Sequence, residues 1–295
     1  MSKKVWKGYL FVIASAVIYG CMPLMASHIY ADGVTSLTLV FLRNILSLPL
    51  LAVLAYRQKK TLKVPAAALP HISLLALFGC CVTPMLLFSA YQHMASGTAT
   101  VFHFIYPAVV VLAEWMLFKT KISAKNLISV ALCLGGIAMF YTPGQPISGT
   151  GSAFALTSGF TYAAYILLLS RFGYREISGF LLNFYVATVS SCVMLPLCVV
   201  SNQLSLPTNM GTWLLCAFFA AVVTAGASVL FQQGTFIIGG QKASVLSAME
   251  PITGVVVGAL LLNETVSPAV AIGSVMVIAA SILIALKESS QKKEA

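Results

Sequence analysis

The sequence predicts an all-α membrane protein in which ten transmembrane helices form two inverted five-helix repeats. Hydrophobic residues make up 59% of the 295 residues, charged residues make up only 8%, and the mean hydropathy is +0.96. A soluble domain is typically about one quarter charged. One pattern of residues also occurs twice along the chain, and the basic residues fall on alternate connections. Together these observations favour a duplicated protein that crosses the bilayer many times.

Ten apolar segments approach or reach the length of about 20 residues that a transmembrane helix needs. The connections between them are short, so we expect no separate soluble domain. The segments are residues 8–27, 36–56, 69–91, 96–118, 124–142, 151–170, 178–200, 211–237, 242–262 and 267–286.

The first segment recurs 143 positions later in the chain. The matched pairs are Gly8 with Gly151, Phe11 with Phe154, Ser15 with Ser158 and Tyr19 with Tyr162. The N-terminus could pass for a signal peptide, but the apolar run of such a peptide is usually only about 7–15 residues. A cleaved leader also has no reason to be duplicated. We therefore interpret this segment as a retained first helix.

The fourth segment recurs 144 positions later as the ninth. The matched pairs are Val101 with Val245, Pro107 with Pro251, Val111 with Val255, Leu117 with Leu261, Ser123 with Ser267 and Ile128 with Ile272. Tyr106 stands where the second copy has Glu250, so the copies differ at one buried polar position. We expect Pro107 and Pro251 to break their helices and to act as hinges.

Charge predicts the orientation of the chain in the membrane. All 17 Lys and Arg residues except Arg43 lie before the first helix or after an even-numbered helix. The positive-inside rule then places both termini in the cytoplasm. Each half holds an odd number of helices, so the second half enters the membrane from the opposite side. The predicted division is a first repeat at 1–142, a periplasmic or extracellular linker at 143–150, a second repeat at 151–286 and a cytoplasmic tail at 287–295.

The ten segments, the prolines that enter helices four and nine, and the run EPITGVVVGALLLNETVS at 250–267 resemble the EamA-type drug/metabolite transporters. The resemblance covers residues 8–286 in both repeats. Such repeats commonly carry a Gly/Asn-Glu pair after helix four or nine, here Asn263–Glu264, whereas the first repeat has Lys119–Thr120. The resemblance implies export of small metabolites or amino acids without an ATP-binding part. The absence of a GxxxxGK[ST] pattern agrees with this.

Two charged residues inside the predicted helices are the first candidates for a substrate site. Glu250 lies about eight residues into its helix, roughly 12 Å deep at 1.5 Å per residue. It acts either in transport or as a packing group with a structural partner. Arg43 either lines the cavity or locks helix two to a neighbour. Burying a charge in the membrane is costly, so we expect Arg43 to have a carboxylate or carbonyl partner.

Helix four carries a polar stripe. His103 and Glu114 return to within about 20° of one line at 100° per residue, and Tyr106 lies to one side. His103 is either a hydrogen-bonded part of the scaffold or part of the pathway. Glu114 lies one turn from the cytoplasmic end, where it either lines the pathway or pairs with Lys119 or Lys121.

Aromatic residues at matched positions in both repeats suggest the walls of a pocket. Tyr19 matches Tyr162, and Tyr165 lies one turn further along. Tyrosine combines an apolar ring with a hydroxyl donor, which suits a mixed polar and apolar ligand. Gln232 in helix eight is a weaker candidate for the same cavity.

These residues predict a secondary transporter that exports an amino acid or a related amphiphilic metabolite by alternating access across the inner (plasma) membrane. The alternative is a proton-coupled exporter of organic cations or drugs, in which Glu250 or Glu114 exchanges substrate for a proton. A distant alternative is an intramembrane enzyme, although the one aspartate (Asp32) and the scattered histidines offer no catalytic or metal cluster. We expect no cofactor, metal or nucleic acid, and a monomer or homodimer whose seven cysteines are reduced packing residues.

Overall fold

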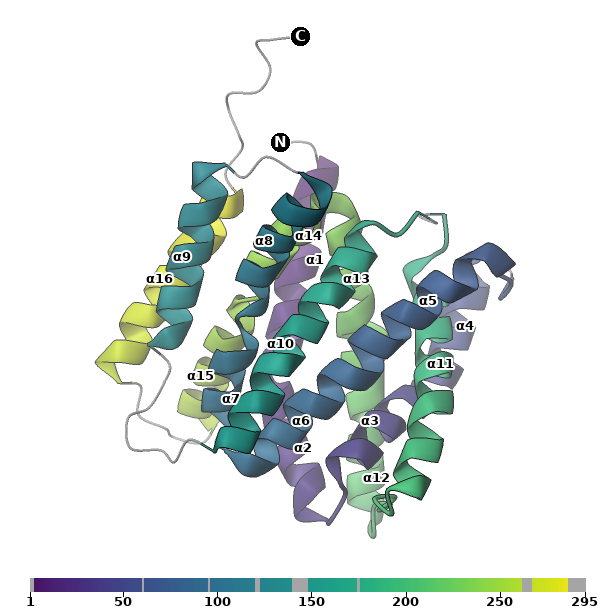
Figure 1. The fold of residues 1–295 in the computed structure, drawn as a ribbon. Coiled ribbons are helices and arrows are strands. Elements are labelled where there is room, and N and C mark those ends of the chain that lie inside the picture. Colours follow the sequence, from purple (N-terminus) through teal and green to yellow (C-terminus); the bar gives the residue numbers. More distant parts are fainter. Residues whose placement is uncertain are drawn as a thin grey trace.

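The computed structural model describes residues 3–59, 61–94, 96–119, 123–139, 148–173, 176–261 and 267–285, and every regular element in these residues is a helix. Figure 1 shows a bundle of helices that run up and down side by side. Helix α1 begins and helix α16 ends at the same end of this bundle, which we call the terminal end. We call the opposite end the distal end.

The elements divide between the two halves of the chain. The first half contains α1 (Lys3–Gly20), α2 (Met22–Ala31), α3 (Ser36–Ile45), α4 (Leu48–Lys59), η1 (Ala66–Ala68), α5 (Leu69–Leu75), η2 (Ala76–Val82), α6 (Thr83–His93), α7 (Ser96–His103), α8 (Tyr106–Phe118) and α9 (Ala124–Ala138). The second half contains α10 (Gly149–Ser170), α11 (Gly179–Val200), α12 (Met210–Phe219), η3 (Ala220–Ala227), α13 (Ser228–Ile238), α14 (Gly240–Leu246), α15 (Met249–Leu261) and α16 (Pro268–Ala285).

These elements line up end to end as ten membrane-spanning segments. Seven helical stretches are long and apolar enough to cross a membrane: Lys4–Ala31, Ser36–Gln58, Ala66–His93, Thr98–Phe118, Gly149–Ser170, Gly179–Val200 and Met210–Ile238. Helices α9 and α16 are shorter apolar helices, and α14 and α15 together form the ninth segment. The ten-helix prediction is therefore confirmed. Residues 143–147 of the predicted linker lie outside the described residues. So do Thr120, Lys121, Asn263, Glu264 and residues 286–295.

Helices at matched positions in the two halves begin with matched N-cap residues. Thr35 caps α3 and Ser178 caps α11, each accepting a hydrogen bond from the backbone N–H three residues later. Ser123 caps α9 in the same way, and Ser267 accepts a bond from the N–H of Val270 at the start of α16. Such caps satisfy backbone donors that a helix leaves free. The two halves therefore begin matching helices with matching chemistry.

Helix packing also follows the repeat. Helix α1 packs along α13, and its counterpart α10 packs along α6. Helix α1 also contacts α15, as α10 contacts α7 and α8, while the matched helices α3 and α11, and α9 and α16, pack against each other. Exchanging the halves leaves this set of contacts unchanged. The arrangement is thus two interlocked copies of one five-span unit.

Glycines allow the closest of these contacts. A Cβ on Gly8 would lie 2.7 Å from Ile238, and a Cβ on the matching Gly151 would lie 3.2 Å from Met94. Gly136 of α9 and Gly273 of α16 lie against each other's backbone carbonyls, so a Cβ on either would overlap the other helix. Small residues let membrane helices approach closely and gain van der Waals contact.

Two irregularities occur at matched places in both halves. The fourth and ninth segments turn at Phe104–Ile105 and at Ser247–Ala248, directly before the helices that contain the predicted hinge prolines. The third and eighth segments contain the π-helical elements η2 and η3, whose first residues are 144 positions apart. Sequence periodicity did not predict the π-helices.

The first two segments are irregular in the first half only. A turn at Cys21 separates α1 from α2, and a turn at Leu46–Ser47 separates α3 from α4. Their counterparts α10 and α11 are continuous helices of 22 residues each. The predicted spans over 8–27 and 36–56 are present, and each consists of two helices joined by a turn. Met22–Pro23 and Leu48–Pro49 follow these turns, since proline fits the first turn of a new helix better than a helix interior.

Candidate functional site

A small cavity lies within the bundle where the two halves meet. Its volume is about 50 Å³, room for only a few water molecules. The residues that line it are Tyr19, Met22, Arg43, Gly79, Thr83, Pro84, Leu87, Phe88, His103, Tyr162 and Glu250. Five of the predicted site residues are in this set: Tyr19, Arg43, His103, Tyr162 and Glu250. All lining residues except Tyr162 and Glu250 come from the first half.

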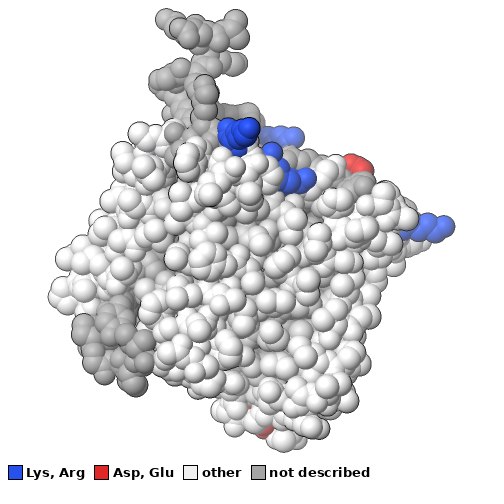
Figure 2. Space-filling model, in the orientation of Figure 1, with Lys and Arg blue, Asp and Glu red and all other residues white. Residues whose placement is uncertain are grey.

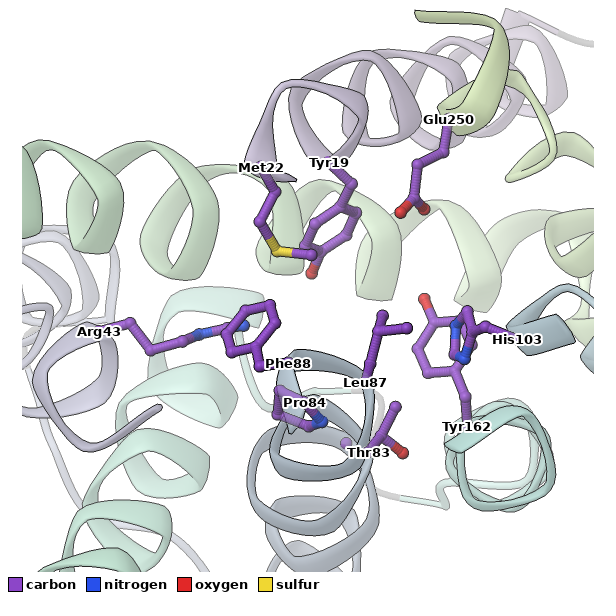
Figure 3. Close-up of a pocket in the computed structure, with 11 residues that line it drawn as sticks. Tyr19, Met22, Arg43, Thr83, Pro84, Leu87, Phe88, His103, Tyr162 and Glu250 are labelled. Carbon is purple, nitrogen blue, oxygen red and sulfur yellow. The ribbon is translucent and has the colours of Figure 1, made fainter. Parts of the chain in front are cut away.

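Glu250 brings an acid into this cavity from the first turn of α15. Figure 3 shows its carboxylate pointing into the space between Tyr19 and Tyr162. Within the described residues this carboxylate has no hydrogen bond and no ion pair. Gly20 of α1 permits its position, because a Cβ there would lie 2.5 Å from the Glu250 carbonyl oxygen. The carboxylate is therefore held in the cavity without a fixed partner.

Arg43 brings a base to the opposite side of the cavity in Figure 3. The residue is only 4% exposed. Its Nε donates to the Thr224 hydroxyl at 3.2 Å, and its guanidinium lies 6.0 Å from the centroid of the Phe219 ring. A hydroxyl and an aromatic ring thus take the place of the expected carboxylate or carbonyl partner. A guanidinium has five N–H donors, so donors remain for a ligand.

His103 ends helix α7 at the turn before α8, and the residue is 4% exposed. Its Nδ1 lies 2.8 Å from the hydroxyl of Ser158 on α10. The ring contacts Tyr106 and Tyr162, with centroids 5.3 and 5.5 Å away. Gly159 allows this approach, since a Cβ there would lie 2.6 Å from the His103 carbonyl oxygen. Packing and one hydrogen bond therefore fix the imidazole at the cavity wall.

Aromatic rings form a layer behind this wall. Tyr106 meets Tyr162 edge to face at 4.8 Å, and Tyr162 stacks on Tyr165 and Phe231 at 5.7 and 6.0 Å. Such pairs add about 0.5–1.5 kcal/mol beyond the area they bury. Tyr106 and Tyr165 contact the cavity residues without lining the cavity itself. Tyr19, in the wall, lies within 2.8 Å of the Ser228 hydroxyl.

Gln232 and Glu114 lie away from the cavity. The Gln232 amide donates to Tyr165 Oη at 3.4 Å and to Asn183 Oδ1 at 3.2 Å, so it supports the aromatic layer. Glu114 accepts a hydrogen bond from the Gln241 amide at 2.8 Å near the terminal end of α8. The structure thus gives Glu114 a partner other than the lysines considered from the sequence.

Sequence reasoning missed the apolar side of the cavity, which helix α6 and the element before it provide. Gly79, Thr83 and Leu87 are spaced four residues apart, so they share one helical face. That spacing was visible in the sequence, but nothing polar distinguished it from ordinary packing. A Cβ on Gly79 would lie 2.5 Å from the Tyr165 ring, so this glycine joins the cavity wall to the aromatic layer.

Hydrogen bonds join the two halves at the distal end. Asp32 accepts bonds from the Thr208 backbone N–H and hydroxyl and from the Asn209 amide. These bonds, led by that of the Thr208 hydroxyl, lower the pKa of the Asp32 carboxyl below its ordinary value of 3.8. Thr35 and Thr38 both donate to the Gln203 carbonyl, at 2.6 and 2.7 Å. We call these contacts between residues 32–38 and 203–209 the distal clasp.

Within the described residues, no three His, Cys, Asp or Glu side chains come together as metal ligands would. The side chains that line the cavity differ in character. The cavity has an acid, a base, a histidine and aromatic rings, with apolar surface from α6. This mixture can bind a small molecule that carries both charges and an apolar part.

Comparisons with known proteins place the chain in a family. The sequence model of the EamA-like transporter family matches residues 6–142 and again residues 149–286. An uncharacterized transporter of Archaeoglobus fulgidus is 26% identical over 95% of this chain and 97% of its own length. The uncharacterized inner membrane transporter YicL of Salmonella typhimurium is 24% identical over 98% of both chains, and the uncharacterized transporter YcbK of Bacillus subtilis is 26% identical over 87% and 86%.

One solved crystal structure has the same fold. It superposes with a TM-score of 0.75 over 94% of this chain and 95% of that chain, at 16% sequence identity. At this identity the likeness concerns the fold alone. The family match in both halves confirms the resemblance found in the repeated prolines and the run at 250–267. The chain therefore belongs to the EamA-like transporter family and is a multi-pass membrane transporter built from two repeats.

Proposed function

We propose that the protein is a secondary transporter that exports a small zwitterionic metabolite, most simply an amino acid, by alternating access. The observation that carries this proposal is the pair of opposite charges across the cavity. Glu250 and Arg43 lie on opposite sides of the cavity, and both keep hydrogen-bonding capacity that no described residue uses. An ammonium group on one side and a carboxylate on the other would satisfy both.

The remaining surface of the cavity suits an apolar side chain. Met22, Pro84, Leu87 and Phe88 line it between the charged groups. Binding sites for small molecules are usually mostly apolar, with a few polar groups that fix orientation. A ligand with an aliphatic or aromatic portion and two charges therefore matches the lining better than a fully polar metabolite does.

The small volume supports a mechanism in which the halves move. A cavity of about 50 Å³ is too small for a whole amino acid, so the halves must separate to admit one. The distal clasp joins the halves at one end, and the Glu114–Gln241 contact joins α8 to α14 at the other. Breaking one set while keeping the other would open the cavity to one side at a time, as inverted repeats permit.

The same features support a second candidate, proton-coupled export of organic cations. A carboxylate without a fixed partner can hold either a proton or a cation, and the Tyr162 ring offers a face for cation–π contact. Arg43 distinguishes the two candidates, because an organic cation without a carboxylate has no negative group that the Arg43 guanidinium could bind. In this candidate Arg43 would serve only to hold α3 against Thr224 and Phe219.

The charge distribution supports an orientation with both termini in the cytoplasm. On the face that Figure 2 shows, Lys and Arg side chains gather at the terminal end, and the described surface between the two ends is uncharged. The uncharged belt suits the lipid interior, and the basic end suits the cytoplasmic side. We place the protein in the inner (plasma) membrane on this basis.

A ligand screen followed by transport measurements tests the proposal. We expect thermal stabilisation of the purified protein by apolar amino acids, and counterflow of the same amino acids in proteoliposomes. Arg43→Gln should weaken amino-acid binding about 10- to 150-fold, the range for losing a hydrogen bond to a charged group. The same variant should leave binding of simple amines unchanged. Counterflow of quaternary ammonium compounds but of no amino acid would favour the second candidate instead.

A further inference from the structure

Three polar groups at the Glu250 side of the cavity have no partner among the residues that the structure describes. The Glu250 carboxylate and the Tyr162 hydroxyl have no hydrogen bond within the described residues, and both residues line the cavity. Figure 3 shows the Tyr162 hydroxyl pointing toward the carboxylate, with His103 beside it. His103 uses one ring nitrogen, Nδ1, to contact Ser158, and its Nε2 has no partner in the same part of the chain.

The contacts of Ser158 favour one of the two neutral tautomers of His103. The Ser158 hydroxyl donates its single hydrogen to the Ala155 carbonyl at 2.6 Å. With its hydrogen on that carbonyl the hydroxyl accepts toward His103, and this arrangement favours Nδ1 as the N–H donor across the 2.8 Å contact. In a neutral imidazole the other nitrogen is an acceptor. Nε2 therefore offers a lone pair at the cavity wall.

An acceptor beside a carboxylate suits a ligand group that has several N–H donors and a positive charge. A primary ammonium has three N–H bonds, enough for the Glu250 carboxylate, the His103 Nε2 and the Tyr162 oxygen together. A quaternary ammonium has none, so it would leave all three groups desolvated and unpaired, which is unfavourable. A carboxylate would meet the negative charge of Glu250.

We propose that Glu250, His103 and Tyr162 form a subsite for a primary ammonium group, and that Ser158 is a positioning residue that fixes His103 as an acceptor. This inference rests on the proposed function in that it takes the cavity to be the substrate site. It adds an orientation: the substrate enters with its amine toward α15 and α7 and its carboxylate toward Arg43 on α3. It also excludes quaternary ammonium compounds as substrates.

Four ligands with the same aliphatic chain test the subsite on the purified full-length protein. They are L-leucine, 3-methylbutylamine (which lacks the carboxylate), 4-methylpentanoate (which lacks the amine) and N,N,N-trimethyl-L-leucine (which lacks N–H donors). We expect the first two to bind, and the last two to bind at least about tenfold more weakly, as expected for lost charge-assisted hydrogen bonds. Equal binding of L-leucine and its trimethyl derivative would overturn the subsite.

The same ligands separate this inference from the proposed function. If 3-methylbutylamine binds as tightly as L-leucine and 4-methylpentanoate does not bind, the ammonium subsite stands and the zwitterion proposal fails. If neither ligand with a primary ammonium binds, the subsite is wrong regardless of what the protein transports.

Variants of His103 and Ser158 test the role of Nε2. In His103→Gln the amide oxygen can reach the position of Nε2, whereas the shorter side chain of His103→Asn reaches only that of Nδ1. We expect His103→Gln to keep the preference for L-leucine over its trimethyl derivative, and His103→Asn to lose about tenfold in that preference. If both variants lose the preference to the same extent and still fold, His103 has a structural role only and does not bind the ammonium group.

Ser158→Ala should remove the contact that holds His103 in one tautomer. ¹⁵N NMR of labelled histidine measures the tautomer directly. We expect the His103 signals of the wild type to show protonated Nδ1 and unprotonated Nε2, and those of Ser158→Ala to show a mixture. Ser152→Ala is the matched control, because it removes another buried hydroxyl of α10, one that has no hydrogen bond to any described residue. A wild-type His103 with protonated Nε2 would refute the role assigned to Ser158.

Discussion

The two halves of the transporter share a framework and differ in the residues that reach the cavity. Their caps, the turns in spans four and nine, the π-helical elements and the helix contacts occur at matched positions. The acid, the base and the histidine of the cavity do not. The first half supplies Arg43 and His103 from helices that a turn interrupts or ends, while the second half supplies Glu250 where the first has the buried Tyr106. The framework therefore follows the repeat, and the acid, the base and the histidine of the cavity come from positions at which the two halves differ.

The difference between spans one and six shows how such a departure arises. Helix α10 is continuous and presents Tyr162, whereas the matching span turns at Cys21 and places Tyr19 and Met22 on either side of the turn. The Tyr19 hydroxyl lies within hydrogen-bonding distance of Ser228, and that of Tyr162 has no partner in the described part of the chain. The Tyr19 hydroxyl therefore contacts a neighbouring helix. The Tyr162 hydroxyl has no such contact with a described residue.

The sharpest test of the comparison is whether matched loops lie on opposite sides of the membrane. Positions 61 and 204 are 143 residues apart, in the loops after α4 and after α11. In a background without native cysteines, Thr61→Cys should label only from the cytoplasm and Leu204→Cys only from outside, because an odd number of spans separates them. Labelling of both from one side would contradict the inverted arrangement.

The next largest effect should come from the acid that only the second half carries. Glu250→Gln removes the charge but keeps the shape, so the fold should remain while binding of ligands with an ammonium group falls about 10- to 150-fold. Binding and counterflow in proteoliposomes measure this. Glu114→Gln is the matched control, because Glu114 lies outside the cavity and its partner Gln241 can still bond to an amide. Equal losses in both variants would remove Glu250 from the site.

A smaller effect should be a difference in stability between alanine variants of the matched glycines Gly8 and Gly151. Gly8→Ala places a methyl group 2.7–2.9 Å from the β-branched Ile237 and Ile238, which cannot easily move aside. We expect a loss of about 1–3 kcal/mol in stability, typical of overpacking. A methyl group on Gly151 would lie 3.1 Å from the His93 Cβ and 3.2 Å from the flexible Met94 side chain, which is further than the contacts at Gly8, so Gly151→Ala should cost less. Thermal unfolding in detergent compares the two, and equal losses would mean that packing is equally tight in both halves.

The smallest effect should come from the distal clasp. Asp32→Asn keeps one acceptor oxygen, so we expect the melting temperature to fall by less than it does in Gly8→Ala. Because hydrogen bonds lower the pKa of this carboxyl in the folded protein, its contribution is present above the ordinary value of 3.8 and is lost as the pH falls through the lowered pKa. The difference between the variant and the wild type should thus be constant at neutral pH. A difference that vanishes near pH 7 would contradict this assignment.

Much of the candidate site was visible in the sequence, for a physical reason. Ionisable residues are costly in the bilayer, so Glu250 and Arg43 stood out as residues that need a function or a partner. Tyr19 and Tyr162 stood out because they are matched in the repeats. Gly79, Thr83 and Leu87 did not, since small and apolar residues on a membrane helix are indistinguishable from those that pack. Whether these residues bind substrate stays a prediction that the experiments above address.

The sequence by itself determined the ten spans, their order and the two repeats, because hydrophobic length and the repeated residue pattern can be read along the chain without knowledge of the packing. Only the tertiary structure decided which polar groups meet. Arg43 is bonded to Thr224, 181 positions away, and His103 to Ser158, 55 positions away. Such pairings depend on how the helices pack, and on turns such as Cys21 that shift the helical face. They are properties of the assembled bundle, and no single helix contains the information that specifies them.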